Sequence, residues 1–174
     1  MKFTETKIKG VYIVEVELRE DERGYFARVF SRKELQDIGI DFSIAQVNQS
    51  LTKRKGIIRG MHYQKEPFAE DKLMMCVQGR TYNVAVDMRK DSITYTQWVG
   101  VELSPEFHNM FLVPKGCANG FQALEDNALV QYPVSADYNK ESEYGVRWND
   151  PAIGIEWPIQ DGIVSDKDKS WPDI

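Results

Sequence analysis

The sequence predicts a single all-β domain, a barrel or a sandwich, with one or more short helices. Its 174 residues are the length of one ordinary domain. Short runs of β-branched and aromatic residues recur along the chain, and turn signals separate them. Hydrophobic residues make up 42% and charged residues 28% of the chain, which is a globular composition and not a disordered one.

The predicted strands are short segments in which β-branched and aromatic residues alternate or cluster. They are residues 11–18, 72–77, 81–88, 95–103, 109–113 and 128–134. Turn signals lie between them, for example at Gln78-Gly79 and at residues 114–116. Short strands at this spacing are typical of an all-β barrel or sandwich.

One helix is predicted after residue 31. Ser31 can cap it, and Glu34 follows at the capping-box spacing. Leu35 and Ile38 would form its apolar face, and Gly39 would end it. After Asn149 the chain is rich in Pro and Trp, so we expect this tail to cover the barrel as irregular structure.

Composition excludes several classes of function. The net charge of −5 disfavours general nucleic-acid binding, which needs a dense basic face. No apolar run is long enough to span a membrane or to serve as a signal peptide. Cys76 and Cys117 form no CxxC pair and are typical of reduced thiols in the cytosol, so a cytoplasmic protein is expected. His62 and His108 are the only histidines, and two histidines cannot build a three-histidine metal site.

The densest group of candidate residues is RGMHYQ at residues 59–64. Arg59 and His62 would face opposite sides of a regular strand, but Gly60 permits a bulge that brings both to one pocket. The alternative is that His62 is a buried histidine with satisfied hydrogen bonds and Arg59 a surface charge.

Three further side chains have both a structural and a chemical interpretation. Lys72 would be a solvated edge residue or, if it points inward, would need an anionic partner or a developing oxyanion. Tyr132 would belong to the core with its hydroxyl at the rim, or would donate a proton in a dry site. Asp168 would belong to a solvated charge run, or would orient and stabilise a histidine.

Taken together and in order, these motifs resemble the dTDP-4-dehydrorhamnose 3,5-epimerase family, nucleotide-sugar epimerases on the cupin, or jelly-roll, barrel. The resemblance covers nearly the whole chain. Its main segments are RGYF (23–26), QVNQS (46–50), RGMHYQ (59–64), VAVDMR (84–89), WNDP (148–151) and SDKD (165–168).

The resemblance implies a mechanism on a 4-keto-6-deoxy nucleotide sugar, in deoxysugar biosynthesis of the rhamnose type. His62 matches the base that removes a proton beside the ketone, and Asp168 its carboxylate partner. Lys72 matches the cation near the C4 oxygen, and Tyr132 the proton donor on the other face. No metal or organic cofactor is implied, because the ketone of the substrate is the electron sink.

The resemblance also implies binding residues and a partner subunit. Arg59 and Arg23 would meet the diphosphate, and Tyr138 and Phe26 would stack on the base. In this family the N-terminal strands cross to a neighbouring subunit, so Arg23 and Phe26 are expected to serve the partner's site in a homodimer. The remaining residues at matching substrate-binding positions are Gln46, Asn48, Asn83, Asn119, Glu143 and Lys167.

The chain departs from the family pattern at four positions. Asn119 stands where the family usually has His, and Asn83 where it usually has Asp. We expect the two amides to contact each other or the sugar and to alter substrate choice or the scope of epimerisation; the alternative is a neutral change. Arg28 replaces a common Glu and Leu51 a common Arg, which leaves dTDP, CDP and GDP sugars open.

The alternatives to epimerisation at both C3 and C5 are other activities that the same barrel can carry. Epimerisation could involve C3 and C5 or C3 alone. A ketoisomerase would move the ketone between C4 and C3. A metal-dependent oxygenase needs several histidine ligands, which one pocket histidine cannot supply. A non-catalytic sugar-binding cupin would not need a base and an acid. His108 precedes the strand at 109–113 and is expected at the surface.

Overall fold

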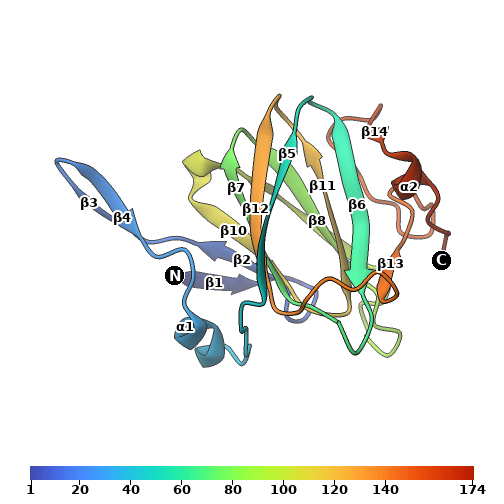
Figure 1. Cartoon of the computed structure of the whole chain (residues 1–174), viewed down its shortest axis with the longest axis horizontal. Helices are drawn as coiled ribbons and strands as arrows, with labels where there is room; N and C mark the ends of the chain where they lie inside the picture. Colours follow the sequence, from blue (N-terminus) through green and yellow to red (C-terminus); the bar gives the residue numbers. More distant parts are fainter.

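Two sheets lie face to face in the computed structural model, which describes all of residues 1–174 (Figure 1). The first sheet has the order β1 (Lys2–Glu5), β2 (Tyr12–Glu15), β10 (Asn109–Val113), β7 (Lys72–Gln78), β12 (Ala128–Val134) and β5 (Gln46–Thr52). The second has the order β13 (Glu143–Gly145), β6 (Ile57–Gln64), β11 (Cys117–Ala123), β8 (Thr81–Asp87) and β9 (Trp98–Leu103). The predicted all-β fold with short helices is confirmed.

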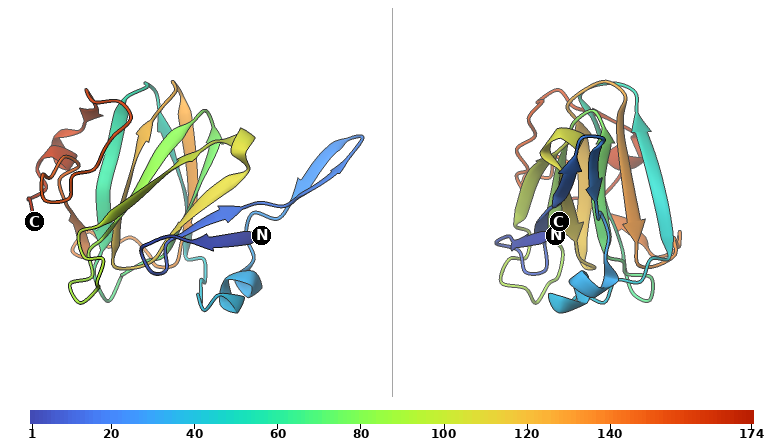
Figure 2. Two further views of the ribbon diagram at one scale, coloured as in Figure 1. Left: turned by 180° about the vertical axis from the view of Figure 1, so that it is seen from behind. Right: turned by 90° about the vertical axis from the view of Figure 1, so that its left-hand side faces the viewer.

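The segment predicted as one strand over residues 11–18 is wrong, because it belongs to two elements. β2 ends at Glu15, and the chain then leaves the sheet as the hairpin β3 (Leu18–Asp21) and β4 (Gly24–Ala27). The hairpin extends away from the barrel (Figures 1 and 2). Apolar residues alternate from Val14 through Val16 to Leu18, so the pattern does not reveal where the chain changes sheets. The segment predicted over 95–103 is also shorter, since β9 begins at Trp98.

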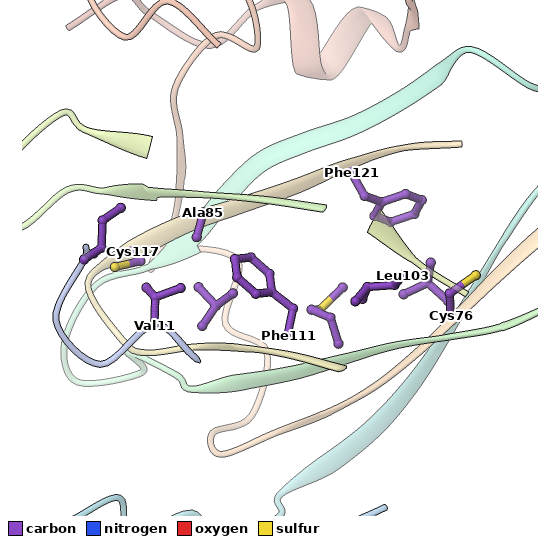
Figure 3. Packing of buried hydrophobic residues seen from close by; sticks show 11 residues of the cluster. Val11, Cys76, Ala85, Leu103, Phe111, Cys117 and Phe121 are labelled. Carbon is purple, nitrogen blue, oxygen red and sulfur yellow. The ribbon is translucent and has the colours of Figure 1, made fainter. Parts of the chain in front are cut away.

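The core between the sheets contains side chains from both of them (Figure 3). Phe111 of β10 and Val130 of β12 contribute from the first sheet, and Ala85 of β8 and Phe121 of β11 from the second. The two buried cysteines are free thiols and lie at opposite ends of this cluster in Figure 3. The barrel is thus closed by apolar packing without a disulfide.

Helix α1 (Arg32–Asp37) confirms the predicted helix and its cap. The Ser31 side chain accepts a hydrogen bond from the Glu34 N–H, and Leu35 is buried against the outer face of the first sheet. Gly39 follows with a φ of +84°, a backbone conformation that glycine adopts without a steric penalty. The Glu34 carboxylate does not complete a capping box; it binds the Met1 amino group at 2.7 Å.

The tail after residue 149 is more ordered than the sequence predicts. It covers the outer face of the second sheet through Ile153, Trp157 and Val164. It also contains β14 (Ile163–Val164), which pairs in parallel with β6, and helix α2 (Asp166–Lys169). The structure contains one further helical turn, the 3₁₀ segment Pro105–Phe107. Neither α1 nor α2 has the length or the apolar character of a membrane-spanning helix.

His108 ends the 3₁₀ turn, as the predicted turn before β10 requires. It is half-buried, and its ring lies edge-on against Tyr25 of the hairpin, with the ring centres 5.3 Å apart. The expectation that it is simply a surface residue is therefore only partly correct.

Candidate active site

A bulge in β6 brings Arg59 and His62 to one side of the strand. His62 pairs with Asn119 of β11, and Arg59 pairs with Phe121, so β6 has one more residue than β11 between these pairs. Gly60 lies in the bulge with a φ of +127°, and a Cβ there would lie 2.6 Å from the Cα of Gly120. Only glycine fits this close approach of two strands. The predicted bulge is confirmed.

The cavity next to this bulge has a volume of about 490 Å³ and lies between the two sheets. All four residues predicted to be catalytic line it. His62 comes from the second sheet, Lys72 and Tyr132 from the first, and Asp168 from α2, which lies beside β6 in Figure 1. The arrangement therefore places candidate acids and bases on opposite walls of one cavity.

A smaller cavity of about 180 Å³ adjoins the first and shares His62, Lys72 and Tyr132 with it. Its other lining residues include predicted binding residues, namely Gln46, Asn48, Tyr138 and Glu143. Another cavity, of about 810 Å³, is lined by none of the four predicted catalytic residues. The chemistry is thus concentrated where the two smaller cavities meet.

His62 and Asp168 form a short ion pair or hydrogen bond, with 2.6 Å between Nε2 and Oδ1. Asp168 is held by α2, where its own N–H donates to Ser165 Oγ, and its Oδ2 accepts from the Gly60 N–H. Burial alone would raise the pKa of Asp168, but the bonds from His62 and Gly60 outweigh it and hold this pKa below its ordinary value. An ionised carboxylate only accepts, so neutral His62 carries its proton on Nε2, and Nδ1 is the unprotonated nitrogen.

Trp171 supports His62 from the tail and was not singled out by sequence reasoning. Its ring lies edge-on to His62 with the ring centres 6.1 Å apart. It also lies against Gly145, where a Cβ would approach the indole to 2.5 Å. A tryptophan so far along the chain gives no sequence signal of this contact.

Lys72 points inward and has the anionic partner that an inward lysine requires. Its Nζ lies 3.1 Å from Glu70 Oε1, and the two side chains are only 12% and 10% exposed. Glu70 also lines the smaller cavity. Sequence reasoning missed Glu70, although its spacing of two residues from Lys72 is that of neighbours on one face of a strand.

Tyr132 lies on β12 opposite Asn48 of β5. Burial raises the pKa of its phenol above the ordinary value, the charge of Glu70 raises it further, and Arg59 lowers it. The phenol therefore carries its proton at neutral pH and can donate it.

Arg59 is anchored at the mouth of the cavity by β5. Its Nε donates to Thr52 Oγ1 at 3.0 Å, and its Nη2 donates to the Leu51 carbonyl at 3.1 Å. A guanidinium held in this way still has free N–H groups for an anion.

Tyr138, Glu143 and Lys167 form a connected group at the rim. The Tyr138 hydroxyl donates to Glu143 Oε2 at 2.9 Å, and Lys167 Nζ donates to Glu143 Oε1 at 2.6 Å. Burial would raise the pKa of Glu143, but these two partners keep it below its ordinary value. Gln46 joins the group by accepting from the Tyr138 N–H.

Asn83 and Asn119, which were expected to contact each other or the sugar, do not hydrogen-bond to each other. The register of β8 and β11 pairs Asn119 with Ala85 and Asn83 with Phe121, so the two amides are offset by two residues. Asn119 lines the larger cavity and donates to the Val84 carbonyl at 3.2 Å. Asn83 is fully buried, donates to Thr81 Oγ1, and lines neither site cavity, so it does not share the cavity with Asn119.

Arg23 and Phe26 do not reach the cavity of their own chain. They lie on the β3–β4 hairpin, where Arg23 pairs with Asp21 and Phe26 is 61% exposed. Arg28 lies near the base of the hairpin and contacts Glu34 at 3.4 Å. Leu51, the other departure near the expected nucleotide, is exposed on β5.

A family model described as dTDP-4-dehydrorhamnose 3,5-epimerase matches residues 5–174. The chain belongs to this family. It is 41% identical to the dTDP-4-dehydrorhamnose 3,5-epimerase of Methanothermobacter thermautotrophicus, over 98% of this chain and 92% of that protein. Membership in the family makes it an enzyme of the isomerase class.

Solved structures of the family superpose on nearly the whole chain. The dTDP-4-dehydrorhamnose 3,5-epimerase of Elizabethkingia anophelis NUHP1 is 40% identical with a TM-score of 0.96, and covers 99% of this chain and 96% of its own. The enzyme of Bacillus anthracis, solved with TDP and PPi bound, is 41% identical with a TM-score of 0.95, and covers 99% of both chains. The fold is therefore the cupin-like barrel of these epimerases.

Proposed function

We propose that this enzyme epimerises a dTDP-4-keto-6-deoxy sugar at C3 and C5 by proton transfer through an enolate, in deoxysugar biosynthesis. The observation that carries the proposal is the placement of a His–Asp pair and a protonated tyrosine on opposite walls of one cavity, with a lysine on the same sheet as the tyrosine. A base and an acid on opposite walls can remove a proton from one face of a carbon and return one to the other face. Binding alone requires no such set.

The first step is removal of a proton beside the ketone. Nδ1 of His62 takes the proton from C3 or C5, and the electrons of the C–H bond form the enolate. Asp168 keeps the proton of His62 on Nε2 and stabilises the imidazolium that forms. The negative charge develops on the C4 oxygen.

Lys72 and Tyr132 complete the reaction. The Lys72 ammonium is the donor for the developing oxyanion, and a preorganised donor of this kind is worth about 3 to 4 kcal/mol in the transition state. Tyr132 then gives its phenolic proton to the opposite face of the carbon, which inverts the centre. The ketone of the substrate accepts the electrons throughout, so the steps require no redox cofactor.

The diphosphate would lie at the mouth of the cavity, where Arg59 is anchored on β5. The dTDP assignment is supported by the relative whose structure holds TDP. Two buried free thiols suit a reducing compartment, and we place the enzyme in the cytoplasm.

We further propose a homodimer in which the β3–β4 hairpin of each subunit completes the other's site. Arg23 and Phe26 are exposed and remote from the cavity of their own chain. In the dimer, Arg23 of one subunit would meet the diphosphate bound to the other, and Phe26 would stack on the base. Arg23→Ala would then raise KM for the nucleotide sugar while sedimentation still shows a dimer. A monomeric enzyme with full activity would contradict this part of the proposal.

The decisive experiment is proton exchange in heavy water. Incubation with dTDP-4-keto-6-deoxyglucose should place deuterium at C3 and at C5, read by NMR. Deuterium at C3 alone would restrict the enzyme to one centre, and a carbonyl moved to C3 would make it a ketoisomerase. The absence of deuterium at both carbons, with dTDP, CDP and GDP sugars alike, would refute the proposal.

A further inference from the structure

Glu70 is a buried carboxylate in the site to which the mechanism above gives no role. It lies two residues before the start of β7, its side chain is 10% exposed, and its ionic partner is Lys72 Nζ at 3.1 Å. It lines the smaller cavity together with His62 and Tyr132. The presence of a carboxylate here requires an explanation, because an anion beside the site of a developing enolate opposes the formation of that enolate.

The reason lies in the position of the lysine. A lysine side chain has a flexible four-carbon stem with many rotamers, and its ammonium is costly to bury without a partner. Lys72 makes no hydrogen bond to another protein group, so Glu70 is the one polar partner that fixes its Nζ at the lining of the two cavities. One N–H of the ammonium faces Glu70, and the others remain available.

We propose that Glu70 is a positioning residue, whose carboxylate holds the Lys72 ammonium at the junction of the two cavities with its free N–H groups toward the C4 oxygen of the substrate. The inference rests on the proposed function, since it assigns a role within the same reaction. Glu70 touches neither the reacting carbon nor its proton; it acts through Lys72.

The electrostatic effect of Glu70 on Tyr132 supports the same role. Burial is the largest cause of the raised pKa of Tyr132, and the charge of Glu70 raises it further. Glu70 therefore also helps to keep the phenol in the protonated form that donates.

Asp71, the next residue, provides a matched control. Its Oδ1 accepts from the Lys115 N–H and its Oδ2 from the Ser135 hydroxyl. It lines the 810 Å³ cavity rather than the two site cavities. Asp71→Asn therefore removes the same charge one residue away, on the other side of the chain.

The test compares kcat and KM of Glu70→Gln, Glu70→Asp and Asp71→Asn. Glu70→Gln should lower kcat by about 10- to 100-fold and change KM little, because the ammonium acts on charge that develops only in the transition state. Glu70→Asp keeps the charge and should recover part of this loss. Asp71→Asn should leave kcat within about twofold of the unaltered enzyme.

A double-mutant cycle with Lys72→Ala separates positioning from a general structural effect. If Glu70 acts through Lys72, Glu70→Gln should cause no further loss of kcat when Lys72 is already alanine. The double variant leaves no unpaired buried charge, so it remains measurable if Glu70→Gln alone folds poorly. Losses that multiply, or a Glu70→Gln enzyme with an unchanged kcat, would overturn the inference. Because the unaltered enzyme is assayed beside them, lack of deuterium exchange there would refute the proposed function instead.

Discussion

Two buried aspartates, one at the end of a strand and one on a short helix, show how differently one residue type serves fold and function. Asp87 ends β8 and is fully buried; it accepts from the Arg89 guanidinium and from the hydroxyls of Ser92 and Thr94. Asp168 lies on α2 and accepts from His62 and from the Gly60 N–H. Both carboxylates have a pKa below the ordinary value despite burial, so burial and charge do not distinguish them.

The difference lies in the partners. The side chains that bind Asp87 lie within 7 residues of it, and together they close one turn. Asp168 is bound by a ring 106 residues away, and that ring is 31% exposed to the cavity. A carboxylate whose partner still has a free nitrogen on a cavity is equipped for proton transfer, whereas a carboxylate saturated by local donors stabilises a turn.

The largest expected effect is the loss of the base. His62→Ala should lower turnover by about two to four orders of magnitude, because no other histidine lines the cavity. His108→Ala is the matched control, since it removes the other histidine, whose ring contacts Tyr25. Steady-state kinetics of both variants check this. Turnover by His62→Ala equal to that of His108→Ala would remove His62 from the mechanism.

Asp87, the carboxylate that closes the turn after β8, should matter for stability and not for catalysis. Asp87→Asn leaves Arg89 without its anionic partner and weakens the bonds to Ser92 and Thr94. We expect the free energy of unfolding to fall by about 2 to 3 kcal/mol, measured by chemical denaturation. Turnover below the unfolding transition should stay within about twofold of normal, and a large loss would mean that the turn also shapes the site.

The acid dependence of stability sharpens the same comparison. The bonds from Arg89, Ser92 and Thr94 outweigh burial and lower the pKa of Asp87 from 3.8 to about 2. The unfolded chain thus binds this proton more readily, so the contribution of about 2 kcal/mol is present above pH 4 and is lost as the pH falls toward 2. The stability difference between the unaltered protein and Asp87→Asn should shrink over this range, and a difference that stays constant would contradict the assignment.

The smallest expected effect is a difference in kcat between variants that lack the cap of one helix or of the other. Ser165 caps α2 by accepting from the Asp168 N–H, and Ser31 caps α1 in the same way from the Glu34 N–H. Each change to alanine removes a cap worth about 1 kcal/mol. Only Ser165→Ala should lower kcat, by a few-fold, because α2 positions Asp168. Equal kcat values for Ser165→Ala and Ser31→Ala would show that the cap of α2 has no part in the site.

Local signals in the sequence were enough for several elements. β10 and β12 were predicted with the bounds that the structure gives them, since each is a compact apolar run between turn signals. The cap of α1 at Ser31 was predictable because capping depends on residues three positions apart. The bulge at Gly60 was predictable because Arg59 and His62 would face opposite sides of a regular strand. The glycine between them permits the extra residue that brings both to one side.

Features that depend on how distant parts of the chain pack together could not be predicted from local signals. Helix α2 is only four residues long, and it exists because Ser165 and the contact with β6 hold it. The contact of Trp171 with His62 depends on the path of the tail. The absence of a hydrogen bond between Asn83 and Asn119 depends on the register of β8 and β11, which no single strand encodes. The four residues predicted to be catalytic were brought together by family resemblance, and the structure places them around one cavity.

The central claim is that the His62–Asp168 pair abstracts the proton. It is tested most directly by the rate of deuterium incorporation at C3 of dTDP-4-keto-6-deoxyglucose in heavy water near neutral pH, compared between Asp168→Asn and Asp87→Asn. Asp168→Asn should slow this exchange by about three orders of magnitude, because the amide favours the wrong tautomer of His62, while Asp87→Asn should leave it within about twofold. Exchange in Asp168→Asn as fast as in Asp87→Asn would contradict the account.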